Sequence, residues 1–141
     1  MRGRVLGVDV GERRVGLAIS DPSGTLARPL TTLTVSGGAD AVDQVVDAIA
    51  RLAADDDGLA SVVVGLPVRL DGTPGPQTAN VTTFINALRA RVALTVETEG
   101  EQLTSREAEA RLAIREKDWR RRKEQLDAAA AAIILQDYLD R

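Results

Sequence analysis

Hydrophobic and polar residues follow different periods along this chain, and each period predicts a different kind of element. Short β-rich runs at 4–10, 15–21 and about 30–35 are separated by Gly or Pro, which predicts three antiparallel strands. The continuous apolar run at 61–66 predicts a strand covered on both faces, and another strand is expected at about 93–99. The pattern therefore predicts a mixed five-stranded sheet, with three antiparallel strands followed by parallel ones.

Helical spacing fills the segments between and after the later strands. Apolar residues recur at helical spacing within 42–53 and 81–92, and a T-x-x-E capping box that begins at Thr104 predicts the start of a further helix. The segment 126–139 is rich in alanine and apolar on nearly all faces, which predicts a helix buried against the sheet. The order β-β-β-α-β-α-β-α-α, without an internal repeat, predicts a single α/β domain flanked by helices.

Composition limits the chemistry that this domain can perform. The 141 residues include 44% hydrophobic ones, which suits one core of ordinary size. The chain has no cysteine and no histidine, which removes disulfides, thiolate nucleophiles and the usual general base. Catalysis must then use carboxylates, hydroxyls, arginine, lysine or a bound ion. No apolar run is long enough to span a membrane and no export leader is present, so we expect a cytoplasmic protein without a membrane partner.

Charge is distributed unevenly along the sequence. The net charge of −3 argues weakly against a nucleic-acid partner. From Arg106 to Lys123, however, eight basic residues stand against four acidic ones, so that this segment is locally cationic. The chain has only three aromatic residues, Phe84, Trp119 and Tyr138, which are too few for a platform on which successive bases stack.

The first candidate site residue is Asp9, in the segment VLGVDVGERRVGLAISD that begins at Val5. Asp9 stands near the end of the first predicted strand, and the carboxyl ends of strands are where sites gather in sheets of this kind. Arg13 or Arg14, at the following turn, could meet a phosphate. Asp9 and Gly11 are equally well explained as turn formers of a plain β-hairpin, and the local sequence leaves both interpretations open.

Two further acidic candidates lie far along the chain. Glu97, Glu99 and Glu101 alternate, so that in a regular strand they share one face, and periodicity does not choose among them or exclude a solvated edge. Asp127 begins the predicted last helix, where it could be a ligand or a helix cap. Three carboxylates together would hold Mg²⁺ or Mn²⁺, and two such ions about 4 Å apart can activate water against a phosphodiester.

Four segments, in this order and spacing, resemble the signature blocks of the YqgF/RuvX family of small bacterial RNase H-like nucleases. These segments are VLGVDVGERRVGLAISD, VVVGLPVRLDGTPGPQ, EGEQLTSREAEARL and LDAAAAAIILQDYL. The resemblance runs nearly end to end, and it implies the RNase H-like fold. It also implies that Asp9, Glu101 and Asp127 are the catalytic metal ligands, and here it selects Glu101 where periodicity does not.

The resemblance also implies a substrate. The family is assigned to processing of the 5′ end of precursor 16S ribosomal RNA, and some members are described as Holliday junction resolvases similar to RuvC. We therefore expect a metal-dependent nuclease that acts on structured RNA or branched DNA. Association with the ribosome and a homodimer are further expectations, whereas the choice between RNA and DNA stays open.

Further expectations concern the residues that bind the substrate. Gln77 matches the last residue of the family's G-L-P…G…G-x-Q loop, and the loop could lie beside the substrate backbone. Arg121, Arg122 and Lys123 precede Asp127 and are well placed to bind phosphate. The alternatives are that Gln77 is an ordinary loop residue and that the basic run is a solvated turn.

The chain departs from the family pattern in two places. Gly100 and Gln102 stand where the family has an Asp and an Arg, and Ala130 stands where a RuvC-like pattern has a further acid, three residues after Asp127. These departures keep open a non-catalytic RNA-binding factor as an alternative function. A third class, the sugar-kinase-type ATPases, shares the topology but needs two such halves to enclose a nucleotide, and this chain supplies one.

Overall fold

The computed structural model of the chain describes the backbone of residues 3–69, 71–101 and 119–141, and within these ranges it leaves the side chains of residues 101 and 119–125 undescribed. Within the described ranges, strands and helices alternate in the predicted manner. Their order is β1 (Val5–Val10), β2 (Arg14–Ser20), β3 (Ala27–Thr34), α1 (Gly38–Ala54), β4 (Ser61–Pro67), α2 (Thr78–Arg89), β5 (Thr95–Glu101) and α4 (Trp119–Leu139).

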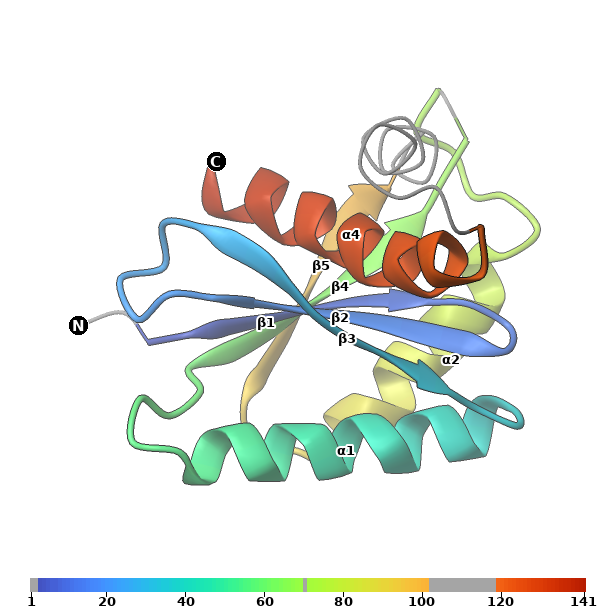
Figure 1. Cartoon of the computed structure of the whole chain (residues 1–141). Helices are drawn as coiled ribbons and strands as arrows, with labels where there is room; N and C mark the ends of the chain where they lie inside the picture. The colour runs from blue at the N-terminus through green and yellow to red at the C-terminus, as the bar shows by residue number, and fades with distance from the viewer. Residues whose placement is uncertain (1–2, 70, 102–118) are drawn as a thin grey trace.

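The five strands form one mixed sheet in the order β3-β2-β1-β4-β5. β1, β2 and β3 pair antiparallel, while β4 is parallel to both β1 and β5. The predicted mixed sheet, with its antiparallel meander followed by parallel strands, is therefore confirmed. Because β1 lies at the centre and its parallel neighbours end at the same edge, residues at the ends of β1, β4 and β5 face one rim of the molecule (Figure 1).

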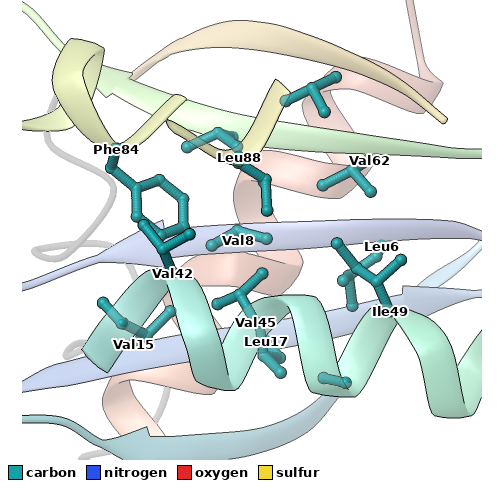
Figure 2. Packing of buried hydrophobic residues seen from close by; sticks show 14 of the residues in the cluster. Leu6, Val8, Val15, Leu17, Val42, Val45, Ile49, Val62, Phe84 and Leu88 are labelled. Atoms are coloured by element: carbon teal, nitrogen blue, oxygen red, sulfur yellow. The ribbon is translucent and has the colours of Figure 1, made fainter. Parts of the chain in front are cut away.

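One face of the sheet is covered by α1 and α2, as Figure 1 shows below the strands. Leu6 and Val8 of β1 are fully buried there. Val45 of α1 and Leu88 of α2 pack against them without exposure to solvent (Figure 2). Removing a side chain of this size from water is worth about 1.5–3 kcal/mol, so this layer is the main hydrophobic core.

Among the described elements, α4 covers the other face, where it crosses β1 and β2 at close range (Figure 1). Gly7 allows this approach, because a Cβ there would lie 2.8 Å from the Cβ of Leu135. Small residues on the helix side complete the fit, since Ala131 is fully buried against Ala18 and Val63. The run of alanines in the last helix is thus explained by a sheet face that leaves little room for side chains.

Several predicted boundaries need correction. The third strand begins at Ala27 rather than about residue 30, the second helix ends at Arg89, and the fifth strand extends to Glu101. The largest error concerns the last helix, which begins at Trp119 instead of residue 126. Arg, Lys and Glu are good helix formers, and they extend the apolar helix toward its N-terminus. Asp127 therefore lies inside α4, and its interpretation as a helix cap is wrong.

The capping box predicted at Thr104 lies outside the described residues. No helix in the described part of the chain is long and apolar enough to cross a membrane.

Candidate active site

The candidate site begins with Asp9, one residue before the end of β1. Successive side chains of a strand point to opposite faces, so Asp9 lies on the same face as Gly7, which is the face that α4 covers. Across the ladder Asp9 pairs with Gly16 of β2. Paired residues in antiparallel strands have Cα atoms about 4.5–5.5 Å apart and share a face, so Gly16 is the nearest cross-strand neighbour of Asp9 below the helix.

Asp127 reaches the same point from α4. A Cβ at Gly16 would collide with the carbonyl oxygen of Asp127, so the helix backbone at Asp127 rests directly on Gly16. Asp127 also stands one helical turn before Ala131, whose carbonyl oxygen lies over Gly7. The two contacts place Asp127 over Gly16 of β2 and Ala131 over Gly7 of β1. Because Gly16 pairs with Asp9, the backbones of Asp9 and Asp127 come close to each other on this face, although they stem from opposite ends of the chain.

Arg14 completes this cluster. Its Nε donates a hydrogen bond of 2.7 Å to Oδ2 of Asp127, and the two side chains form an ion pair. Both are partly exposed, with 34% of the Arg14 side chain and 24% of the Asp127 side chain accessible. Asp127 is thus held by a cation that solvent and substrate can reach. Arg13, the other predicted phosphate ligand of this turn, is exposed.

The three alternating glutamates of β5 differ in their surroundings. Glu97 accepts a hydrogen bond of 3.0 Å from the hydroxyl of Tyr138, and burial, together with this contact, raises the pKa of Tyr138. Glu99 is buried, with 6% of the residue exposed, and forms an ion pair with Arg141. Glu97 is therefore engaged by the last turn of α4 and Glu99 by Arg141, which follows the helix, and both glutamates lie on the face that α4 covers.

Glu101 is the last residue of β5, and its backbone pairs with Pro67 of β4. Its side chain is outside the description, so the convergence of three acids stays a prediction. Among the residues that the structure describes, no group of three or more acidic side chains is close enough to hold a metal ion. The donor chemistry of Asp9 and Asp127 fits Mg²⁺ or Mn²⁺, because both ions prefer carboxylate oxygen ligands.

The remaining predicted substrate-binding residues fall in two places. Gln77 lies at the N-cap of α2 and lines a pocket together with Gly11 and Glu12 of the β1–β2 turn. Arg121, Arg122 and Lys123 lie in α4, within the two turns that precede Asp127, and not in a turn of the chain as one interpretation had it. Their side chains are outside the description.

Sequence reasoning missed two ion pairs of the site, since it did not anticipate the pairing of Arg14 with Asp127 or of Arg141 with Glu99. For Gly16 the sequence left open a positive φ or a close approach of two backbones, and the structure shows the close approach, because Gly16 is the contact point of α4. The sequence did contain a signal for the contact between α4 and the sheet. Glycines on the predicted strands and the alanine run at 128–132 together indicate that two backbones approach each other closely.

The sheet order β3-β2-β1-β4-β5, with an aspartate at the end of the first strand and a second aspartate on the helix that crosses it, defines the RNase H-like class of fold. The chain is similar to Thermus thermophilus RuvC in complex with a Holliday junction substrate, with a TM-score of 0.54, 17% identity, and coverage of 98% of this chain and 94% of that one. It is also similar to an inorganic polyphosphate/ATP-glucomannokinase from Arthrobacter, with a TM-score of 0.50 and 18% identity, but covers 48% of that longer chain. These likenesses establish the fold.

The chain belongs to the RuvX family, whose model carries the description "Holliday junction resolvase" and matches residues 3–141. A Chloroflexus aggregans protein named "Putative pre-16S rRNA nuclease" is 47% identical over 136 residues, which cover 96% of this chain and 92% of the relative. A protein of the same name from Anaeromyxobacter dehalogenans is 43% identical over 138 residues, which cover 98% and 97%. The resemblance drawn from the four sequence blocks is confirmed.

Proposed function

We propose that this protein hydrolyses phosphodiester bonds of nucleic acid at the rim where β1 ends, with Asp9, Glu101 and Asp127 as ligands of Mg²⁺ or Mn²⁺. Membership of the RuvX family makes the chain a nuclease, that is, a hydrolase that acts on nucleic acid. The assignment of the three residues rests mainly on one observation. The backbone of α4 at Asp127 lies on Gly16, the cross-strand partner of Asp9.

Glu101 enters the proposal by its position in β5. Parallel strands end at the same edge of a sheet, and β5 is joined to β1 through β4. Glu97 and Glu99 lie earlier in the strand and have partners in Tyr138 and Arg141. Glu101 is the last residue of β5 at this edge, and we assign it the ligand role by this position and by the family pattern.

The proposed reaction assigns different roles to the metal ions and to the basic residues. When bound, two divalent ions supply the activation of water and the stabilisation of the leaving oxygen, which a protein without histidine or cysteine needs. Arg14 orients the carboxylate of Asp127 through its hydrogen bond. Arg13, Arg121, Arg122 and Lys123 supply cations along the path of the nucleic-acid backbone, where each phosphate contact strengthens binding at low salt.

The substrate that we propose is the 5′ end of precursor 16S ribosomal RNA. Two relatives that match almost the whole chain are named "Putative pre-16S rRNA nuclease", which supports precursor 16S RNA, and the 5′ end is what the family resemblance implies. A Holliday junction is the second candidate, which the description of the family model favours. Association with the ribosome, a homodimer and a cytoplasmic location remain predictions made from the sequence.

Cleavage assays with matched variants test the proposed residues. The purified protein is incubated with a precursor 16S RNA fragment, a four-way DNA junction and single strands, each with Mn²⁺, Mg²⁺ or EDTA. Asp9→Asn and Asp127→Asn keep the shape of each side chain and should abolish cleavage, whereas Asp57→Asn, an exposed carboxylate in the loop before β4, should leave it unchanged. Full turnover in both site variants would reject the assignment. Tight RNA binding without cleavage under any condition would favour the non-catalytic factor.

A further inference from the structure

A pocket of about 670 Å³ lies on the opposite face of the sheet from α4, between the first turns of α1 and α2. Its size falls in the range of about 300–1,000 Å³ that is typical of small-molecule sites. Val10, Val42, Val81 and Phe84 form apolar walls, and Figure 2 shows Phe84 and Val42 side by side at this end of the core. Asp9 and Asp127, the two described residues of the proposed metal site, do not line this pocket.

The pocket adjoins the candidate active site through β1. Val10 lines the pocket and directly follows Asp9, and the two side chains point to opposite faces of the sheet. Gly11 and Glu12, in the turn that joins β1 to β2, also line it. Neighbouring residues of a strand are only about 3.3 Å apart along the strand, so the turn that lines the pocket begins directly beyond Asp9. A strand that is cut beside Asp9 can therefore reach the pocket within a few nucleotides by passing around this turn.

The chemistry of the pocket suits a nucleobase and not a phosphate. Among the described residues that line it, none is Arg or Lys, and the one charged side chain is the carboxylate of Glu12. Gln77 and Asn80 add carboxamides, which pair with the donor and acceptor edges of bases, and a carboxylate accepts from an amino group. Apolar walls with a few polar groups at the edge fit a flat, neutral heterocycle.

The pocket is open to an incoming group on the side of α1. A Cβ added at Gly37 or Gly38 would meet no atom within 4 Å, so the chain leaves free space at this wall. Asn80 and Thr83 of α2 are exposed on the facing side. A base can therefore enter between the two helix starts without moving either helix.

We infer that this pocket receives one unpaired nucleobase of the strand whose backbone crosses Asp9. The inference rests on the proposed nuclease function, to which it adds a subsite. Since a base must leave its duplex to enter, the pocket selects substrates with an unpaired nucleotide a few positions from the cut, as at the end of an RNA stem or in a loop.

Thr83 and Thr82 provide a matched pair of variants. Both are exposed, and each hydroxyl donates to the carbonyl oxygen four residues earlier, at 3.0 Å for Thr83 and 2.8 Å for Thr82. Only Thr83 lines the pocket. Thr83→Trp therefore obstructs the pocket, and Thr82→Trp places the same side chain on the same helix outside it. Thermal melting of both variants verifies that each folds.

The measurement is fluorescence anisotropy of single-stranded oligoribonucleotides in the Asp9→Asn background, which keeps the strand intact. A set of strands carries one abasic site at each position in turn. We expect Thr83→Trp to weaken binding of the complete strand about tenfold, as expected for loss of one base contact. We also expect one abasic position to give the same loss, with no further effect of Thr83→Trp on that strand. Thr82→Trp should bind like the parent.

The possible results separate this inference from the proposed function. Equal binding by the two tryptophan variants, or an abasic scan without a distinct position, overturns the base pocket, even where cleavage with the unmodified chain succeeds. The opposite outcome is also informative. If one abasic position weakens binding, if Thr83→Trp removes that position's effect, and if the protein cleaves none of the substrates, then the base pocket is supported and the nuclease assignment is rejected. Asn80→Ala, which removes a carboxamide without adding bulk, should show a smaller loss at the same position.

Discussion

At the scale of single residues, Gly16 determines whether the candidate site can form. The residue has no side chain where α4 touches the sheet, and the atom that a Cβ would strike belongs to the backbone of Asp127. A flexible side chain could move aside, but a helix backbone cannot move without shifting its neighbours. Asp127 can therefore occupy its position only because residue 16 of β2 has no Cβ atom.

Gly16→Ala should lower the free energy of unfolding by about 1–3 kcal/mol, because the added methyl group overpacks a tight contact. It should also reduce cleavage, since α4 carries Asp127 away from Asp9. Denaturation in urea measures the first effect. Gly37→Ala is the control, because a Cβ there meets nothing within 4 Å, and it should change stability little. Equal stability of the two variants would contradict the close packing at Gly16.

Arg14 has two roles that a substitution can separate. Its guanidinium holds Asp127, yet its positive charge repels the cations that we propose for the same carboxylate. The pair is partly exposed, so its contribution to stability is small, about 0–1 kcal/mol. Its electrostatic effect on a neighbouring ion is larger than its effect on folding.

Arg14→Gln should tighten Mn²⁺ binding several-fold, because it removes a like charge close to the site. The same variant should weaken nucleic-acid binding, since a phosphate contact is lost. Calorimetric titration with Mn²⁺ and anisotropy with a labelled RNA measure the two effects, with Arg14→Lys as the control that keeps the charge. Weaker Mn²⁺ binding by Arg14→Gln would mean that orientation of Asp127 outweighs repulsion.

At the scale of elements, the local pattern of the sequence was enough for the central strands. The apolar run at 61–66 was predicted to be covered on both faces, and in β4 its residues Val62, Val63 and Val64 are fully buried. The first strand was predicted at 4–10 and is found at Val5–Val10, with its first four residues buried. The third strand was less clear because β3 lies at the edge of the sheet and is mostly exposed, which removes the hydrophobic pattern. The start of α4 was missed because charged residues carry no apolar period, although they favour helix.

The contacts that form the site could not be predicted from local sequence patterns. The ion pair of Arg14 and Asp127 joins positions 113 residues apart, and the pair of Glu99 and Arg141 joins positions 42 apart. No periodicity links such residues, because their proximity depends on how α4 crosses the sheet. Position along the chain made Asp9 and Asp127 candidates, family resemblance selected Glu101, and the structure adds the packing of the Asp127 backbone on Gly16, the partner of Asp9.

The turn between β2 and β3 is held by one carboxylate. Asp21 accepts hydrogen bonds from the backbone of Leu26 and Thr25 and from both the backbone and the hydroxyl of Ser23. The bond from Leu26 contributes most, followed by those from Ser23 and Thr25, and together they hold the pKa of Asp21 well below its usual value. The folded chain therefore favours the ionised form of this group.

Asp21→Asn should lower the thermal midpoint at pH 7, because the carboxylate is a stronger acceptor than an amide. The sign of the pH dependence follows from the lowered pKa. The contribution of Asp21 is fully present above the unfolded pKa of about 3.9 and is lost as the pH falls towards the folded pKa. The difference between parent and variant should thus shrink below about pH 4 in thermal melts. A difference that stays constant from pH 7 to the acid limit would contradict this origin.

At the scale of the whole molecule, the proposed metal ligands from both ends of the chain lie at one rim of the sheet. The end of β1 brings Asp9, the crossing of α4 brings Asp127, and β5 ends at the same edge with Glu101. The base pocket lies behind this rim, on the opposite face of β1. At this rim the sheet thus separates a group of charged side chains, suited to phosphate chemistry, from an apolar pocket suited to a base.

Binding of Mn²⁺, followed by the loss of its free-ion signal in electron paramagnetic resonance, tests this convergence most directly. The account predicts that Asp9→Asn and Asp127→Asn each weaken binding about tenfold or more, and that the double variant loses little beyond the stronger single one, because both side chains serve one site. Asp57→Asn should bind as the parent does. Unchanged Mn²⁺ binding in either single variant, or losses that simply add in the double variant, would contradict the claim that these two carboxylates share a metal.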